Sequence, residues 1–469
     1  MLEYTLNKKT HMKKTIAFLA AGLFLSSLVS AQFRANDKSG INVFETPKTE
    51  TTFDGVKVTI GGGFTQGFQA LSHSNVATAK VVSGVDQNKL TPIRPGFNLA
   101  SANLLLKTNL ADGVALNMEL YLAARHHNET WVRGGYIQFD KVPFIKWDVL
   151  DNIMKYTTVK VGQMEVNYGD AHFRRTDGGN SIFNPFVENY IMDEFSTEVG
   201  LEADVNYNGI VGVASVTNGL LKGNISVVDS TFDASTTPKT LISAGKNNPA
   251  FIAKLGYDKQ LTEDLRVRLT GSVYYTAGAV SNTLMWGDRT GSNYFGVMDY
   301  AAPSTANAWT GRYNPGFSDK ITALMGNLFV KYHGLEWFST AEIANGRSRT
   351  EATGERNSSQ IATDLVYRFG EDENFWVGAR YNVMACQQYL AADLPAVAAT
   401  STLPAFDAVS KGMYTVGIDR LSFSAGWFIT KNVMAKVEYT NQNYSGFFYN
   451  DIRSNGNFNG IVAQAVVGF

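Results

Sequence analysis

The chain of 469 residues carries almost balanced charge, with 41 Lys and Arg residues against 42 Asp and Glu residues. Glycine is abundant at 43 residues, aromatic residues make up 12%, and proline is low at 11 residues. The formal charge of −1 gives no reason to expect a nucleic acid as a partner. The single cysteine, Cys386, excludes an intramolecular disulfide, and we expect it to be a free thiol in a loop.

The N-terminus has the pattern of a secretory signal peptide. Lys13 and Lys14 precede a short apolar run over residues 15–28, and residues 29–31 form a Val-Ser-Ala cleavage site. This run is too short to span a membrane as a helix. We therefore predict a signal peptide over residues 1–31, with Met12 as the true start, and a short periplasmic segment over residues 32–55.

Beyond residue 55, short segments alternate polar and apolar side chains. In residues 265–276, Arg266 and Arg268 lie on one face, while Val267 and Leu269 lie on the other. A strand with one face in lipid and the other in a watery lumen has this period of two. We predict an all-β fold, a membrane-spanning antiparallel up-and-down β-barrel over residues 56–469. Sixteen strands are expected, at residues 56–66, 97–108, 114–125, 132–140, 156–163, 198–207, 210–217, 250–257, 265–276, 321–332, 335–344, 360–369, 375–384, 417–429, 433–443 and 459–469.

The connections between these strands alternate in length. Tight turns are expected at residues 109–113, 208–209, 333–334, 370–374 and 430–432. Long loops are expected at residues 71–96, 164–197, 218–249, 277–320 and 385–416. Short periplasmic turns and long extracellular loops are typical of membrane barrels. The connection at residues 141–155 is long for a periplasmic turn, and we predict a short helix in it.

The last predicted strand ends on an aromatic residue. Every second residue before Phe469 is apolar, namely Val467, Ala465, Ala463 and Ile461. Such a terminal strand is the usual ending of a bacterial outer-membrane β-barrel, where it closes against the first strand and is read by the insertion machinery. Closure matters because lipid offers no hydrogen bonds to an open sheet edge. The ending predicts the outer membrane as the location.

The long segment after the fifth strand is the candidate constriction of the pore. It is rich in Gly, Asn and aromatic residues, and we expect Phe183, Phe186 and Tyr190 to pin it against the barrel wall; an ordinary surface loop is the alternative. Its charged residues could face permeating ions. The candidate constriction residues are Asp170, His172, Arg174, Arg175, Asp177, Glu188, Asp193 and Glu194.

Strand parity also predicts which charges face the lumen. Rows of opposed charges there set a field that selects solutes by charge and dipole. The alternative is that these side chains only solvate the wall and pair with one another. With Lys107, Lys254, Glu119, Glu336 and Glu342 included, parity assigns ten basic and eight acidic residues to the lumen, and this rough balance predicts weak ion selectivity. The candidate pore-lining residues are Arg125, Lys160, Glu198, Glu202, Asp204, Arg266, Arg268, Lys331, Asp364, Arg368, Arg380, Lys436 and Glu438.

A resemblance to a known family appears at the start of this loop. Residues 159–163 read Val-Lys-Val-Gly-Gln, and residues 165–169 read Glu-Val-Asn-Tyr-Gly. This motif resembles the start of the constriction loop in Gram-negative porins, most of all the phosphate-selective porin (O/P) type and its relatives in Bacteroidota. The resemblance implies a sixteen-stranded barrel, a loop folded into it after strand five, and a homotrimer. It does not extend to phosphate, because no lysine row accompanies the loop.

These observations predict a porin that passes small hydrophilic solutes and ions by passive diffusion. Outer-membrane lipid or lipopolysaccharide, permeating solutes and further copies of the chain are the expected partners. One alternative is a channel specific for an anion or organic acid. Another is a plugged structural or adhesive barrel that binds a partner through its external loops. We expect no enzyme activity, cofactor or metal, because few histidines are present and His126 and His127 point to opposite faces of a strand.

Overall fold

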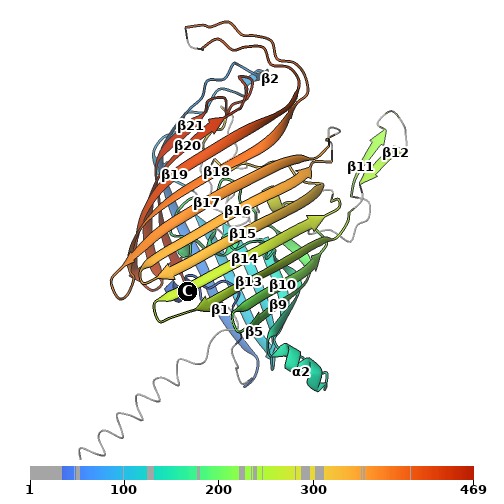
Figure 1. Cartoon of the computed structure of the whole chain (residues 1–469), viewed down its shortest axis with the longest axis vertical. Helices are drawn as coiled ribbons and strands as arrows, with labels where there is room; N and C mark the ends of the chain where they lie inside the picture. The colour runs from blue at the N-terminus through green and yellow to red at the C-terminus, as the bar shows by residue number, and fades with distance from the viewer. Residues whose placement is uncertain are drawn as a thin grey trace, which may run out of the picture.

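The computed structural model describes residues 34–46, 48, 53–98, 100–123, 131–176, 180–220, 228–233, 235, 240–245, 247–279, 281–286, 296–300, 311–349, 351, 354–401 and 403–469. Within them the chain is almost entirely β-structure, arranged as one tall barrel (Figure 1). The strands of its wall are β1 (Lys57–Ser74), β5 (Ser101–Ala111), β6 (Val114–Ala123), β7 (Trp131–Phe139), β8 (Thr157–Glu165), β9 (Thr197–Tyr207), β10 (Ile210–Thr217), β13 (Ala250–Gln260), β14 (Leu265–Thr276), β15 (Lys320–Tyr332), β16 (Leu335–Arg347), β17 (Arg356–Phe369), β18 (Phe375–Leu390), β19 (Gly412–Thr430), β20 (Val433–Ser445) and β21 (Asn457–Gly468).

Each wall strand pairs antiparallel with the next, and the last strand pairs with the first. Thus β1 pairs with β5 on one side and with β21 on the other, with Gly63 opposite Gly468. Beyond β21, the backbone of Phe469 exchanges two hydrogen bonds with Gly62, at 3.0 and 2.8 Å. The predicted closed sixteen-stranded barrel is confirmed, and no sheet edge is left open to lipid.

The remaining elements are short. The strand β4 (Gly96–Phe97) adds a brief pairing to β1, while β2 (Val81–Val82) with β3 (Val85–Asp86), and β11 (Val228–Asp233) with β12 (Thr240–Gly245), form separate hairpins. The helix α2 (Asp148–Met154) lies in the long turn between β7 and β8, where a short helix was predicted. Short 3₁₀ turns are η1 (Lys38–Gly40), η2 (Ala171–Arg174), η3 (Asn180–Ile182) and η4 (Leu284–Trp286).

No helix among the described residues is long and apolar enough to cross a membrane. The strands alternate as their sequences predict. In β14, Leu269 is 59% exposed on the outer face, whereas its neighbour Arg268 is 1% exposed on the inner face. The tight turn at Asn208 and Gly209 has positive φ at both residues, 48° and 87°, which an Asn-Gly pair adopts at little cost.

Several strands are longer than predicted at the ends that carry the long loops; β18 extends to Leu390 and β19 begins at Gly412. One consequence corrects an expectation. Cys386 lies within β18 and not in a loop, and its side chain is buried against the interior cluster that contains Met384 and Ile418.

Candidate functional site

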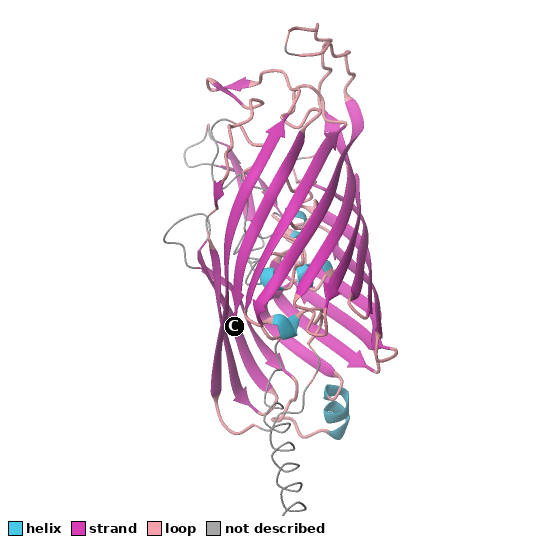
Figure 2. Cartoon of the chain, turned by 90° about the vertical axis from the view of Figure 1, so that its left-hand side faces the viewer, coloured by secondary structure: helices cyan, strands magenta, loops and turns pink. Residues whose placement is uncertain are grey.

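The connection between β8 and β9, residues 166–196, folds into the barrel and fills one side of it (Figure 2). Its backbone is hydrogen-bonded by inward side chains of the wall. Glu438 Oε2 accepts from the N–H groups of Val187 and Glu188 at 2.6 and 2.9 Å. Gln360 accepts from the N–H of Met192 and donates to its carbonyl, both at 2.8 Å. The wall therefore satisfies backbone groups that would otherwise be buried without partners.

Aromatic side chains pack this loop against the wall. Phe183 and Phe186 belong to a buried cluster with Trp376, whose indole N–H donates to the carbonyl of Pro185 at 3.1 Å. Tyr190 belongs to a second cluster with Phe329 and Phe338. The three aromatics predicted to pin the loop are thus buried at its contact with the wall.

The start of the loop is fixed by charge and by close backbone approach. Asp170 pairs with Arg268 at 2.7 Å and with Lys254 at 3.0 Å, and all three side chains are fully buried. The preceding residue, Gly169, has φ of +68°, and a Cβ there would lie 2.1 Å from the sulfur of Met325. Glycine is required at this position because the loop turns directly on the wall.

A second segment also enters the lumen. Residues 32–55 were expected in the periplasm, but the described part from Arg34 to Thr46 lies inside the barrel mouth. Glu45 pairs with Arg268 at 2.7 Å and Lys254 at 3.2 Å. Asn42 donates to Glu336 at 2.5 Å. The entry segment, residues 34–46, is therefore held by charged groups of the wall.

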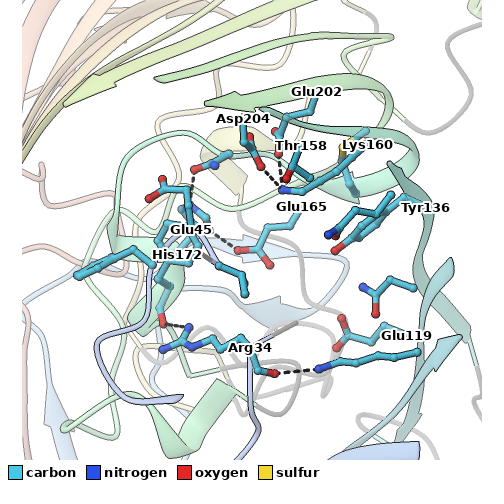
Figure 3. A pocket seen from close by; sticks show the side chains of 18 of the residues that line it. Arg34, Glu45, Glu119, Tyr136, Thr158, Lys160, Glu165, His172, Glu202 and Asp204 are labelled. Atoms are coloured by element: carbon cyan, nitrogen blue, oxygen red, sulfur yellow. Dashed lines mark hydrogen bonds and ion pairs between the residues drawn. The ribbon is translucent and has the colours of Figure 1, made fainter. Parts of the chain in front are cut away.

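Between these two insertions and the wall formed by β5–β9 lies a polar cavity of about 230 Å³ (Figure 3). Five cationic side chains line it, namely Arg34, Lys48, Lys107, Arg133 and Lys160. Five acidic side chains also line it, namely Glu45, Glu119, Glu165, Glu202 and Asp204. The uncharged polar lining includes Asn117, Tyr136, Gln138, Thr158 and Asn167. We define this space as the lumen cavity.

Most of these charges pair across neighbouring strands. Lys160 on β8 contacts Glu202 at 2.8 Å and Asp204 at 2.6 Å, both on β9. Arg133 on β7 contacts Glu119 on β6, and Glu165 at 3.3 Å. Lys107 on β5 donates to the carbonyl of Arg34 at 2.8 Å. The cavity therefore carries both signs of charge at close spacing, with a small net field.

Of the predicted constriction residues, His172 lines the lumen cavity, where its Nδ1 contacts Glu165. The other members that the structure describes are buried in the loop or beneath it. Asp193 pairs with Arg175 at 2.8 Å and with Arg312 at 2.6 Å. Arg174 lies 4.9 Å from the ring centroid of Phe338 and 3.7 Å from Glu336. The remaining members are Asp170, described above, Glu188 and Glu194, which are both buried, and Asp177, which lies outside the described residues.

The predicted pore-lining residues divide into groups. Lys160, Glu202 and Asp204 face the lumen cavity. Arg266, Lys331 and Arg368 line a separate polar pocket at the end of the barrel that carries the short turns. The others are buried, namely Glu198, Arg268, Asp364, Arg380, Lys436 and Glu438. All but Glu198, which accepts from Thr217 and Tyr274 of the wall, are engaged with the loop or with one another. Arg125 lies outside the described residues.

Arg34, Glu45 and Lys48 were missed because nothing in a short polar segment indicates that it will enter a barrel. Arg133 was missed for a different reason. The register shifts between Glu119 and Leu120, so two residues of β7 oppose one of β6 and the parity changes along the strand. Counting parity separately on each side of Gly134 would have placed Arg133 inside.

The closed wall, the apolar outer face and the charged interior define a membrane-spanning β-barrel protein. No family model and no curated protein sequence matches the chain. Among solved structures, it is similar to OmpT, an outer membrane protein of Vibrio cholerae, with 9% identity, a TM-score of 0.45, and coverage of 89% of this chain and 99% of that one.

Two further solved structures are similar to the same extent or less. The outer membrane channel DcaP of Acinetobacter baumannii has 11% identity and a TM-score of 0.45, with coverage of 89% of this chain and 99% of that one. OccK1 of Pseudomonas aeruginosa has 8% identity and a TM-score of 0.36, with coverage of 87% and 98%. Likeness of this degree does not assign a function to the chain.

Proposed function

We propose that the protein is an outer-membrane porin that passes small hydrophilic solutes and ions by passive diffusion. The solutes move along the side of the lumen walled by β5–β9, between that wall and the two inserted segments. The observation that carries the proposal is the lumen cavity, a space lined by polar and charged side chains beside the inserted loop. Water-soluble solutes require such a lining, because an apolar constriction would exclude water.

The loop after β8 and the entry segment together narrow the pore. Both are held by many charged and backbone contacts, so the narrow passage is a fixed part of the barrel. Size exclusion at this passage sets the upper limit on solutes. Because five cationic and five acidic side chains line the cavity, ion selectivity is weak.

The route is tested by blocking it chemically. Thr158 lines the lumen cavity, whereas Thr363 on β17 faces outward, so Thr158→Cys and Thr363→Cys are a matched pair. We expect a charged methanethiosulfonate reagent to reduce single-channel conductance in planar bilayers for Thr158→Cys only. The unsubstituted protein reports any reaction of the buried Cys386. If the mass confirms labelling of Thr158→Cys and the conductance is the same before and after it, solutes do not pass through the lumen cavity.

A plugged barrel is the second candidate, and one observation favours it: two separate segments occupy the lumen and leave a cavity of about 230 Å³. A plugged barrel would give no steady open conductance in the same recordings. A channel specific for an anion or organic acid would instead show saturable block by its ligand. The nearly equal numbers of cationic and acidic side chains give the anion-specific channel no support.

The other partners follow from the same proposal. Lipid and lipopolysaccharide would surround the apolar outer face, and Phe469, whose side chain is 59% exposed, would be read by the insertion machinery. A homotrimer remains a prediction from the family resemblance. Chemical cross-linking in native membranes tests it. Products with the mass of a trimer would support the trimer, and a monomer band alone would exclude it.

A further inference from the structure

An apolar surface projects from the barrel at the turn between β7 and β8. The residues leading into α2 and the helix itself expose five large apolar side chains. These are Phe144 (67% exposed), Ile145 (46%), Trp147 (57%), Val149 (52%) and Ile153 (51%). We call these five side chains the turn patch. The helix lies beyond the rim of the barrel, at the end that carries the short turns (Figures 1 and 2).

The helix has one broad apolar face, and the barrel covers only the part of it that carries Leu150 and Met154. Met154 is 5% exposed and Leu150, four residues earlier, is partly buried. Val149 and Ile153 have the same spacing of four but lie on the part of this face that no described residue covers. The polar residues Asp148, Asp151 and Asn152 occupy the rest of the surface. In a helix that served only as a water-exposed turn, we would expect polar residues at the uncovered positions of Val149 and Ile153.

The turn patch continues the lipid-facing surface of the barrel. Phe144 makes an edge contact with Phe139 at the end of β7, with ring centroids 6.2 Å apart. Phe139 has the same parity as the outward Ile137, which is 39% exposed. Exposed aromatic side chains also lie near the strand ends that carry the short turns elsewhere around the wall, namely Tyr207, Tyr257, Tyr332, Phe369, Phe375 and Trp427. Such an aromatic belt lies at the boundary between hydrocarbon and headgroups.

Exposed lysines surround the turn patch. They are Lys141, Lys146 and Lys155; with Asp140, Asp148 and Asp151 the connection between β7 and β8 has no net formal charge, and Lys141 pairs with Asp112 at 2.9 Å. Lysine side chains next to an apolar surface can lay their alkyl chains on it and reach lipid phosphates with their ammonium groups. The other short turns, such as Asn208–Gly209 and His333–Gly334, carry no comparable apolar residues.

We propose that this turn is a membrane-surface anchor, in which the turn patch is immersed in the phospholipid leaflet on the periplasmic side. This inference rests on the proposed outer-membrane location. The occupant of the patch is the lipid surface, because the patch is continuous with a face that lipid already covers. The anchor fixes the depth and tilt of the β7–β8 side of the barrel, whose inner face lines the lumen cavity.

The test places single nitroxide labels on the full-length mature barrel in vesicles of phosphatidylethanolamine and phosphatidylglycerol. The labelled variant is Ile153→Cys in a Cys386→Ser background. Leu269→Cys, on the outer face of β14, is the lipid reference, and Glu263→Cys, in an exposed turn, is the water reference. Collision with oxygen reports lipid, and collision with a soluble nickel complex reports water.

We expect the label at residue 153 to match the Leu269 reference, with high oxygen and low nickel accessibility. A nickel accessibility equal to that at Glu263 would overturn the proposal. So would spectral broadening that disappears when labelled protein is diluted with unlabelled protein, because a second copy would then cover the patch.

If Ile153→Cys does not fold, quenching of tryptophan fluorescence by brominated phospholipids provides the same reading. The wild-type protein should then be quenched more than Trp147→Phe, and equal quenching would overturn the proposal. Conductance is recorded from the same vesicles. A silent barrel with a lipid-immersed label would therefore refute the pore but not the anchor, and an open barrel with a water-exposed label would do the reverse.

Discussion

The two sides of the lumen use the same kind of wall in different ways. On the side formed by β13–β20, the inward charges beneath the inserted loop are buried against it or against one another, as in the Arg380–Asp364 pair at 2.7 Å with side chains 3% and 1% exposed. Arg266 and Lys331, near the short turns of this side, are 26% and 29% exposed. On the side formed by β5–β9, Lys160 is 20% exposed and its partner Asp204 is 14% exposed. The side formed by β13–β20 is therefore packed like a protein core beneath the loop, whereas the side formed by β5–β9 faces the lumen cavity.

The difference shows that lumen charge in a barrel has two separate roles. Where the loop covers the wall, charged side chains of the wall replace water as hydrogen-bond partners of the loop backbone. Removing one of these side chains leaves a buried polar group of the loop or the wall without its partner. Where the cavity adjoins the wall, water can take the place of a lost partner. The same substitution should therefore affect stability on one side and ion passage on the other.

The largest expected effect is from Asp364→Asn on the packed side. Asp364 accepts from two nitrogens of Arg380, at 2.7 and 2.8 Å, and the change leaves a buried guanidinium without its carboxylate. We expect a loss of about 3–5 kcal/mol in the free energy of unfolding. Urea titration in detergent, followed by heat-modifiability on gels, measures it. An unchanged midpoint would mean that this side is wetter than its packing indicates.

A smaller effect is expected from Gly426→Ala, also on the packed side. An added Cβ would lie 1.9 Å from the indole ring of Trp376, which is held between wall and loop. The overpacking should cost about 1–3 kcal/mol. Single-channel conductance should not change, because Gly426 does not line the cavity. A change in conductance at unchanged stability would reverse the assignment of the two sides.

Asp204→Asn makes the same chemical change as Asp364→Asn but on the cavity side. Lys160 keeps Glu202 as a partner and stays accessible to water, so we expect a loss of less than about 1 kcal/mol. Removing one negative charge makes the cavity potential more positive, so the reversal potential in a salt gradient should shift toward anions. Lys160→Gln should shift it toward cations. A shift in the same direction for both variants would contradict the proposed field.

Lys331→Gln should have the smallest effect. Lys331 pairs with Glu373 at 2.6 Å outside the lumen cavity, with the two side chains 29% and 27% exposed. Partly exposed pairs of this kind contribute about 0–1 kcal/mol. The same urea and bilayer measurements should give values within error of the wild type. A selectivity shift as large as that of Asp204→Asn would indicate that the pore is controlled at this end instead.

The barrel can be predicted from the amino-acid pattern alone. A period of two, the alternation of tight turns and long loops, and a terminal apolar strand ending at Phe469 were sufficient to predict all sixteen strands and their closure. They suffice because lipid imposes a local rule on each strand, an apolar outer face, and a global rule on the sheet, no open edge. The same local rule sorted inward charges such as Arg268 from outward residues such as Leu269.

Which inward charges line the cavity and which are covered by protein depends on long-range contacts. Lys160 and Arg268 are both inward cations on predicted strands, yet Arg268 is buried with Asp170 while Lys160 faces the lumen cavity. The entry segment that carries Arg34 and Glu45 has no periodic pattern at all. Its position depends on contacts with residues more than 200 positions away in the sequence, such as Lys254 and Arg268. A local sequence pattern cannot predict a contact between residues so far apart in the chain.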